Sequence, residues 1–380
     1  MRRNLLLLAV ASVTLACSAA PQGPAPHSAQ PGSIDAGLKV ETVASGLEHP
    51  WGLAMLPDGR MLVTERPGRL RYVERDGRLS QPLTGVPRVY ASGQGGLLDV
   101  ALDPAFSTNR TIYLSFAEPA ESGGGAGTAV LRARLGETGL DSVRVIYRQE
   151  PKVNGGGHFG SRIVFAPDGK MFITQGERFN YRNQAQDLNS LLGKVVRINS
   201  DGTIPKDNPF VGRSGARPEI WSYGHRNMQG AAIEPTTGRL WTIEHGAAGG
   251  DELNHPEAGK NYGWPVITYG KDYNGMRIGE GAVKEGMEQP VFYWDPVIAP
   301  SGITFYTGDK FPQWKNDLFI GSMVPGRLVR IRLRDGAVTL EERYLGDLHE
   351  RIRDVQQGND GLLYLLTDAD NGRVLRVSPK

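Results

Sequence analysis

A histidine at the end of a glycine-rich segment is the residue of this sequence best suited to acid–base chemistry. The segment Asn154–His158 reads Asn-Gly-Gly-Gly-His and lies between two runs with the apolar pattern of strands. Glycine adopts backbone angles that other residues avoid, and it lets a flat ligand approach the main chain closely. An imidazole at this position is suited to act as a general base in an exposed pocket. The alternative is a flexible surface loop that happens to carry His158.

Several polar side chains beside other turns are candidates for binding a ligand. They are Gln94, Glu177, Arg226, Asn227, Arg351 and Arg353. Arg351 and Arg353 are two positions apart, so on an extended strand they point the same way, toward one ligand. Guanidinium groups bind carboxylates through two parallel hydrogen bonds. If these two arginines were only structural, an acidic neighbour such as Asp354 would pair with them.

These residues belong to a repeated pattern of an apolar strand, a turn of the Pro-Asp-Gly type and a second strand. The repeat occupies residues 50–65, 97–115, 161–174, 230–243, 301–320 and 354–366. Units of several strands that begin roughly 45 to 70 residues apart are typical of β-propeller blades, each of which buries its faces against its neighbours. We therefore predict an all-β fold, a six-bladed β-propeller of four-stranded antiparallel blades over residues 38–380. Two stacked sandwiches are the alternative, but they would not repeat one turn six times.

An extra strand precedes the first complete unit. Residues Leu38–Val43 have a strand pattern and no partner nearby in the sequence, so we expect this strand to join the last blade and close the ring. The loops of a propeller surround one mouth of its central channel, where residues from different blades meet. The candidate residues should therefore converge there.

The composition argues for a small-molecule partner. The chain has 43 basic and 41 acidic residues and a formal net charge of +2, which argues against a nucleic-acid partner. Its 50 glycines and 25 prolines are scattered, as in proteins of many short strands joined by tight turns.

The N-terminus predicts export. Residues 1–17 have a charged start and a short apolar run, too short to span a bilayer but typical of a signal peptide. The Leu-Ala-Cys ending resembles a bacterial lipoprotein signal, which would attach a lipid to Cys17, the only cysteine of the chain. Cleavage after Ala20 is the alternative. We expect a periplasmic protein, tethered to the outer membrane if Cys17 is lipidated, with residues 18–36 as a disordered spacer.

Taken in order, these motifs resemble the soluble sugar dehydrogenases that depend on pyrroloquinoline quinone (PQQ), specifically the aldose sugar dehydrogenase branch. The resemblance covers nearly everything from Leu38 to the end. It implies a quinoprotein that uses PQQ and Ca²⁺ to oxidise aldose sugars at the anomeric carbon to lactones. Electrons would pass to an acceptor that the sequence does not identify. Loops shorter than those of the glucose enzymes favour a monomer.

The resemblance also implies roles for single residues. His158 would take the proton of the anomeric hydroxyl, and Glu177 would orient the imidazole, where the glucose enzymes carry Asp. An ion pair between Glu177 and Arg178 on a surface turn is the alternative. Trp294 is expected to form a pocket wall, or else to fill the core. The cofactor would be held by Gln94, Arg226, Asn227, Arg351 and Arg353.

Two calcium sites are implied as well. The main-chain carbonyls of Gly246 and Ala247 would hold a Ca²⁺ that also binds the quinone. A second, structural Ca²⁺ would be held by Glu252, Tyr262, Asp272 and Glu288. The alternatives are solvated surface charge for the second set, and a zinc site made by His245, Asp251 and His255, whose spacing is uncommon for zinc.

One departure from the family affects cofactor binding. Val324 lies where the glucose enzymes carry a cofactor-contacting lysine. Two other functions stay open at this point. A calcium-dependent lactonase of propeller fold would need a carboxylate-rich channel, and a non-catalytic propeller would bind glycans or protein.

Overall fold

The computed structural model describes residues 23–34, 37–121 and 123–380. The predicted export signal and Cys17 lie outside the described residues. Within these ranges almost all regular structure is strand, apart from the helix α1 (Phe106–Asn109) and the short 3₁₀ turns η1 (Arg182–Gln186), η2 (Pro312–Trp314) and η3 (Gly346–Leu348). None of the described helices is long and apolar enough to cross a membrane.

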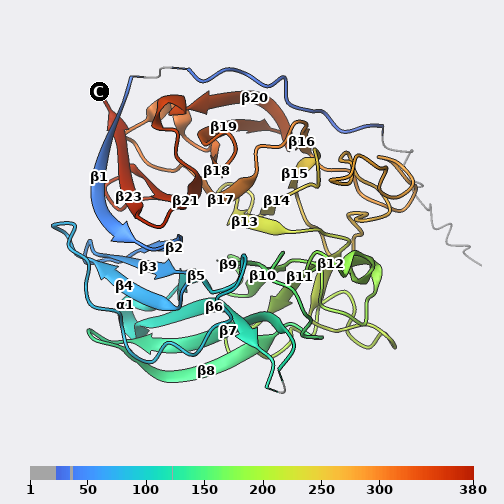
Figure 1. Ribbon diagram of the computed structural model, residues 1–380, viewed down its shortest axis with the longest axis horizontal. Coiled ribbons are helices and arrows are strands. Elements are labelled where there is room, and N and C mark those ends of the chain that lie inside the picture. Colours follow the sequence, from blue (N-terminus) through green and yellow to red (C-terminus); the bar gives the residue numbers. More distant parts are fainter. Residues whose placement is uncertain (1–22, 35–36, 122) are drawn as a thin grey trace, which may run out of the picture.

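The strands form six antiparallel sheets arranged in a ring around a central channel, so the chain is a six-bladed β-propeller (Figure 1). The first three sheets comprise β2 (Pro50–Met55), β3 (Met61–Glu65) and β4 (Arg69–Val73); β5 (Leu97–Leu102), β6 (Thr111–Pro119), β7 (Ala126–Leu135) and β8 (Leu140–Arg148); and β9 (Gly160–Phe165), β10 (Met171–Gln175), β11 (Lys194–Ile198) and β12 (Ile220–Tyr223). The other three comprise β13 (Met228–Ile233), β14 (Leu240–Glu244), β15 (Asp251–Asn254) and β16 (Phe292–Trp294); β17 (Pro300–Phe305), β18 (Leu318–Ser322), β19 (Arg327–Arg334) and β20 (Ala337–Tyr344); and β21 (Ile352–Gln357), β22 (Leu363–Thr367), β23 (Gly372–Pro379) and β1 (Leu38–Leu47).

The sheet of β2, β3 and β4 has three strands rather than the four we expected for every blade. After β4 the chain makes one isolated antiparallel bridge, between Val73 and Leu79, and no further strand of that sheet. The closing strand is confirmed. β1 pairs antiparallel with β23, from Leu38 opposite Pro379 to Leu47 opposite Gly372, and so joins the two ends of the described propeller.

The Pro-Asp-Gly turns have the local chemistry that the repeat requires. In the first blade the Asp58 carboxylate accepts a hydrogen bond from the main-chain N–H of Arg60 at 3.0 Å. Gly59 has φ +86, a left-handed value that glycine adopts at little cost. Between each neighbouring pair of blades lies a cluster of buried apolar side chains. Each blade is therefore stabilised by its two neighbours.

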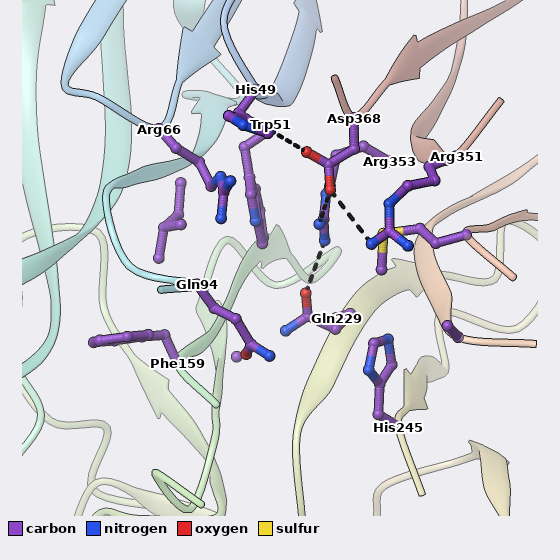
Figure 2. A pocket seen from close by; sticks show the side chains of 14 residues that line it. His49, Trp51, Arg66, Gln94, Phe159, Gln229, His245, Arg351, Arg353 and Asp368 are labelled. Atoms are coloured by element: carbon purple, nitrogen blue, oxygen red, sulfur yellow. Dashed lines mark hydrogen bonds and ion pairs between the residues drawn. The ribbon is translucent and has the colours of Figure 1, made fainter. Parts of the chain in front are cut away.

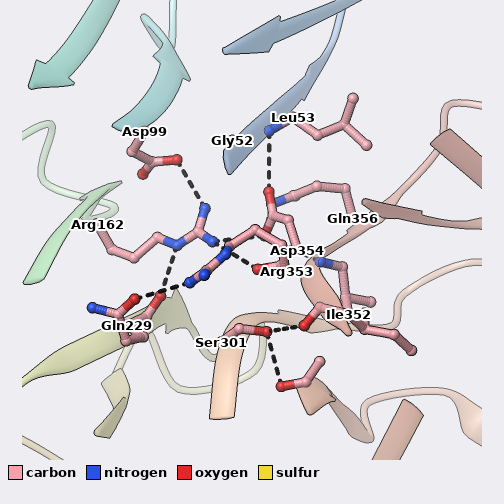
Figure 3. Close-up of polar contacts among 12 residues, drawn as sticks. Gly52, Leu53, Asp99, Arg162, Gln229, Ser301, Ile352, Arg353, Asp354 and Gln356 are labelled. Atoms are coloured by element: carbon pink, nitrogen blue, oxygen red, sulfur yellow. Dashed lines mark hydrogen bonds and ion pairs between the residues drawn. The ribbon is translucent and has the colours of Figure 1, made fainter. Parts of the chain in front are cut away.

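A buried ionic network crosses the channel and ties the innermost strands together (Figure 3). The Arg162 guanidinium lies 2.9 Å from Asp99 and 3.1 Å from Asp354, and all three side chains are buried. Arg162 also donates to the main-chain carbonyl of Gln229 at 2.9 Å. Burial raises the pKa of Asp99 to about 6, although Arg162 acts in the opposite direction. The network links four blades through β5, β9, β13 and β21.

Residues 23–34, which we call the N-terminal strap, differ from the disordered spacer that we expected. They run along the outside of the last blades (Figure 1). The main-chain N–H of Ala25 donates to the Tyr269 hydroxyl at 2.6 Å, and that of Ser28 donates to the Tyr293 carbonyl at 3.0 Å. The His27 ring stacks on Tyr293 with centroids 5.4 Å apart. Small residues let the strap pack closely, and Ala25 and Ser28 are buried.

Candidate functional site

A cavity of about 370 Å³ lies at one end of the channel (Figure 2). Its wall is made by His49, Trp51, Arg66, Gln94, Leu98, Phe159, Gly160, Gln229, His245, Ala299, Met323, Arg351, Arg353 and Asp368. Three of the predicted residues, Gln94, Arg351 and Arg353, therefore share one cavity although they come from different blades. The two arginines face it together, as their spacing predicts.

The cavity wall carries more positive than negative charge. It contains three guanidinium groups, on Arg66, Arg351 and Arg353, and one carboxylate, on Asp368. Arg353 lies 2.6 Å and Arg351 3.7 Å from Asp368, and the His49 imidazole lies 2.9 Å from the same carboxylate. Burial alone would raise the pKa of Asp368, but the charge of Arg353 and the hydrogen bonds from His49 and Arg353 hold it well below its usual value. The Asp368 carboxylate is therefore charged at neutral pH.

Some groups at the site lack the partner that a buried donor or a cation normally has. Arg66 donates to the Gly93 carbonyl at 2.7 Å and forms no ion pair with any described residue. The Nε atom of Arg353 and the Nδ2 atom of Asn227 are buried without a hydrogen-bond partner among the described residues. Buried donors of this kind are costly unless a ligand satisfies them. An excess of guanidinium charge together with free donors fits a ligand that carries several carboxylate or carbonyl oxygens.

His158 and Glu177 form a buried pair beside the cavity. The Nδ1 atom of His158 lies 3.0 Å from Oε1 of Glu177. His158 immediately precedes Phe159 and Gly160, which line the cavity, and its main-chain N–H donates to the Gln94 side chain at 2.8 Å. A Cβ atom at position 176 would lie 2.1 Å from the His158 carbonyl oxygen, so only glycine lets the two loops approach this closely.

The electrostatics of this pair favour a neutral imidazole. Burial lowers the pKa of His158, the hydrogen bond that its Nδ1 donates to Glu177 acts against this, and the nearby Arg226 charge lowers the pKa further. Nδ1 is engaged by Glu177, while Nε2 contacts no described hydrogen-bonding group. The imidazole therefore has one nitrogen held in place and one nitrogen available to accept a proton.

The alternative pairing of Glu177 with Arg178 is not observed. The Arg178 guanidinium is fully buried and donates to the main-chain carbonyls of Gly155, Gly157 and Ala126. Burial lowers the pKa of Arg178 to about 10. Arg178 thus anchors the glycine-rich segment that carries His158.

Arg226 and Asn227 lie behind the cavity wall. Arg226 donates to the carbonyls of His245, at 3.1 Å, and of Gly246. The Asn227 side-chain oxygen accepts from Gln229, a cavity residue, at 3.0 Å. Both side chains are buried, and neither is among those that form the cavity surface.

The carbonyls expected to hold the first Ca²⁺ lie in the hairpin between β14 and β15. The Gly246 carbonyl points to the Arg226 guanidinium, so this oxygen already faces a positive charge. Asp251 fixes the hairpin, because its carboxylate accepts from the main-chain N–H of Gly246 at 2.7 Å and of Ile298 at 2.7 Å. Carbonyl oxygens are donors that Ca²⁺ prefers, so the donor type of this hairpin fits a hard cation, with the Gly246 oxygen shared with Arg226.

The residues expected to hold the second Ca²⁺ do not form one ligand set. Asp272 pairs with Arg182 at 3.1 Å, and Glu288 pairs with Lys260 at 2.9 Å. Glu252 is the carboxylate of the set that has no cationic partner among the described residues, and the Tyr262 hydroxyl donates to the His255 carbonyl at 2.5 Å. The pKa of Glu252 is raised well above the usual value by burial and by the neighbouring Glu244.

The zinc alternative is not supported either. His245 hydrogen-bonds to the Pro300 carbonyl at 2.6 Å, and His255 to the Leu240 carbonyl at 2.8 Å. No three His, Cys, Asp or Glu side chains of the described chain are grouped to hold a metal ion.

Trp294 does not form a pocket wall, which corrects our expectation. Its side chain is fully buried in the apolar cluster between the fourth and fifth blades. Its indole N–H donates to Glu341 at 3.0 Å. Since β16 is the outermost strand of its blade, Trp294 faces the next blade rather than the channel. Val324 is also outside the cavity surface, and the neighbouring Met323 contributes to it instead.

Several cavity residues were missed by sequence reasoning. His49, Trp51 and Arg66 come from the first blade, Gln229 from the fourth and Asp368 from the turn after β22. One signal was available for Arg66, because it directly follows a strand of the first Pro-Asp-Gly unit, as Glu177 follows one of the third.

The fold and the site define a six-bladed β-propeller in which a cavity with an excess of guanidinium groups lies beside a buried histidine–carboxylate pair. The model of the family Glucose / Sorbosone dehydrogenase matches residues 47–376. The chain therefore belongs to this family and is an oxidoreductase, as the order of its motifs predicts.

Relatives within the family support this assignment. The chain is 50% identical over 348 residues to the aldose sugar dehydrogenase YliI of Escherichia coli (strain K12), covering 90% of this chain and 93% of that protein. It is 29% identical over 414 residues to quinoprotein glucose dehydrogenase B of Acinetobacter calcoaceticus, covering 86% and 85% of the two chains.

Solved structures agree. The soluble aldose sugar dehydrogenase of E. coli in its apo form superposes with a TM-score of 0.88 at 49% identity, covering 90% of this chain and all of that chain. The PQQ-bound aldose sugar dehydrogenase of Streptomyces coelicolor superposes with a TM-score of 0.73 at 30% identity, covering 90% and 99% of the two chains.

Proposed function

We propose that this protein oxidises aldose sugars at the anomeric hydroxyl to lactones, with PQQ as hydride acceptor and Ca²⁺ as its partner. The observation that carries the proposal is the buried His158–Glu177 pair beside a cavity with three guanidinium groups and one carboxylate. The names of the relatives in E. coli and A. calcoaceticus point to the same chemistry. A lactonase channel rich in carboxylates would have the opposite charge.

The free donors and the excess charge of the cavity suit PQQ, a planar quinone with three carboxylates. Arg66, Arg351 and Arg353 would bind its carboxylates, while Gln94, also on the cavity surface, would donate to its other oxygens. Val324 stands where the glucose enzymes carry a cofactor-contacting lysine. Arg66 would supply a positive charge in place of that lysine. When bound, PQQ supplies the hydride acceptor, and Ca²⁺ held by Gly246 and Ala247 polarises the accepting carbonyl.

The chain itself supplies the proton transfer. Nε2 of His158 accepts the proton of the anomeric hydroxyl while hydride leaves the anomeric carbon. Nδ1 carries the other proton and donates it in a hydrogen bond to Glu177, which fixes the tautomer and stabilises the imidazolium that forms. Because burial keeps the resting imidazole neutral, the base is ready near neutral pH.

The test is reconstitution. Protein freed of cofactor is titrated with PQQ, with and without Ca²⁺, and assayed with glucose and a dye acceptor. We expect dye reduction that requires PQQ and increases with Ca²⁺. Lactone hydrolysis without dye reduction would indicate a lactonase, and glycan binding without either reaction would indicate a non-catalytic propeller.

We further propose that the protein is exported, monomeric and attached to a membrane through Cys17. The motif at residues 14–17 supports the last point. Cell fractionation and radioactive palmitate incorporation test it, with Cys17→Ala as the control that should lose the label. The electron acceptor is proposed to be a soluble or membrane-bound carrier.

A further inference from the structure

Beside the base, a charged residue is buried and the apolar residue that follows it is exposed, the reverse of the usual arrangement. Arg178 is fully buried, whereas the apolar Phe179 is 46% exposed. Charged side chains are seldom buried without a carboxylate partner, and a phenylalanine ordinarily takes the buried place. Both residues have left-handed backbone angles, with φ +67 and φ +62, which are unfavourable for side chains of this size. The loop is thus built to keep Phe179 outside.

Phe179 lies directly against the base and a second exposed aromatic side chain. Its ring meets the His158 ring edge to face, with centroids 5.1 Å apart. It stacks on Tyr273, with centroids 6.2 Å apart and planes inclined by 23°. Tyr273 is 62% exposed, and neither ring belongs to an apolar cluster of the core. Two aromatic faces therefore remain open to solvent next to the catalytic imidazole.

The two aromatic side chains come from different loops that are held together. The Arg226 guanidinium donates to the Tyr273 hydroxyl at 3.1 Å, so the hydroxyl proton remains free to donate to another group. Asp272 pairs with Arg182, just after Phe179 in the chain, at 3.1 Å. Asp272 also closes a turn through its main-chain N–H to the Met276 carbonyl at 2.8 Å. These contacts fix the ring of Tyr273 beside that of Phe179.

We propose that Phe179 and Tyr273 form the platform on which the sugar ring of the substrate stacks, and that they determine which pyranoses are accepted. This inference rests on the proposed function. An aldopyranose presents an apolar C–H face that packs on aromatic rings, and its hydroxyls can accept from Tyr273. Stacking against Phe179 places the anomeric hydroxyl near His158. Trp294 is fully buried in the core and therefore cannot stack on the substrate.

The experiment measures sugar binding apart from turnover. Protein loaded with PQQ and Ca²⁺ is titrated calorimetrically with 1,5-anhydroglucitol, a pyranose without the hydroxyl to be oxidised. Phe179→Ala and Tyr273→Ala should each raise its Kd by about three- to tenfold, in line with the loss of one aromatic contact. Phe179→Tyr and Tyr273→Phe, which keep the rings, should lie closer to the unmodified protein. In glucose oxidation the alanine variants should raise KM far more than they lower kcat.

The matched control is Val143→Ala, which truncates an exposed apolar side chain on β8 of another blade and should leave the Kd unchanged. The Kd of PQQ is measured first for every variant, so that a loss of cofactor is not mistaken for a loss of sugar binding. Alanine variants that bind the analogue as tightly as the unmodified protein overturn the platform alone. A loaded, unmodified protein that oxidises no aldose overturns the proposed function together with it.

Discussion

The Nδ1 atom of His158 lies 3.0 Å from the Oε1 atom of Glu177, and the two side chains are only 5% and 1% exposed. This hydrogen bond crosses between the loop before β9 and the loop after β10, and it holds the imidazole so that Nε2 remains available. The pair therefore has the geometry of a general base with its orienting carboxylate.

Replacing Glu177 by Gln should lower kcat by about 10²- to 10⁴-fold, because the amide neither fixes the tautomer nor stabilises the imidazolium. The pH profile gives a second readout. Turnover needs neutral His158, so kcat/KM rises as pH increases through the pKa of His158. Glu177 raises that pKa against the effect of burial, so its loss should move the acid limb to lower pH.

The control for this variant is Glu118→Gln, a carboxylate paired with Arg148 and Lys152 away from the cavity. It should keep both kcat and the acid limb. An acid limb that stays in place in Glu177→Gln, or moves to higher pH, contradicts the role given to Glu177.

Replacing Arg162 by Met should reduce the free energy of unfolding by about 3–5 kcal/mol, because Asp99 and Asp354 would be left buried without a cation. Urea denaturation measures this loss. Burial raises the pKa of Asp99 to about 6 even with Arg162 beside it, and loss of the guanidinium raises this pKa further. The destabilisation should therefore be largest well above pH 6 and should shrink as pH falls toward 6, where Asp99 becomes neutral in both proteins. Arg148→Met, which breaks an exposed ion pair with Glu118, should change stability by less than about 1 kcal/mol.

Replacing Arg66 by Gln should raise the Kd of PQQ by about ten- to hundredfold, the worth of a charge-assisted hydrogen bond. Arg66 is the guanidinium of the cavity wall that has no carboxylate partner among the described residues, so its charge is available to the cofactor. Calorimetric titration of the protein with PQQ measures the effect. Arg332→Gln, whose guanidinium pairs with Asp317 outside the cavity, should bind PQQ normally. Equal affinities in the two variants would exclude Arg66 from the cofactor site.

Removing residues 1–36 should destabilise the propeller by about 1–3 kcal/mol, because the strap contributes hydrogen bonds to Tyr269, Tyr293 and Arg343. Removing residues 1–22 keeps the strap and serves as the control, which should unfold at the same urea concentration as the full chain. If both deletions behave alike, the strap has no stabilising role.

Arg353 and Asp354 show how far sequence reasoning reaches at this site. The spacing of Arg351 and Arg353 correctly predicts that both line one cavity. Asp354 is adjacent to Arg353, but successive side chains of a strand point to opposite faces. Asp354 therefore pairs with Arg162 inside the channel, and Arg353 pairs with Asp368 from the turn after β22. Asp368 lies across the hairpin of β21 and β22 and Arg162 comes from another blade, so neither partner leaves a signal in local spacing.

The same distinction applies to the fold. The repeated turn predicts six blades because it recurs along the chain, and the strand pattern before the first unit predicts the closing strand. The burial of Trp294 and the docking of the N-terminal strap depend on surfaces of neighbouring blades. A tryptophan beside a turn and a proline-rich terminus have the same local appearance whether or not such a surface covers them.

The central claim is that His158 is the base that starts sugar oxidation, and rapid mixing of glucose with protein loaded with PQQ and Ca²⁺ tests it most directly. Absorption of the bound quinone reports its reduction in a single turnover, without a dye. The His158→Ala variant should bind PQQ with unchanged Kd, while its quinone is reduced at least about 10²-fold more slowly than in the unmodified protein. Reduction at the unmodified rate in this variant would show that the proton is taken by another group.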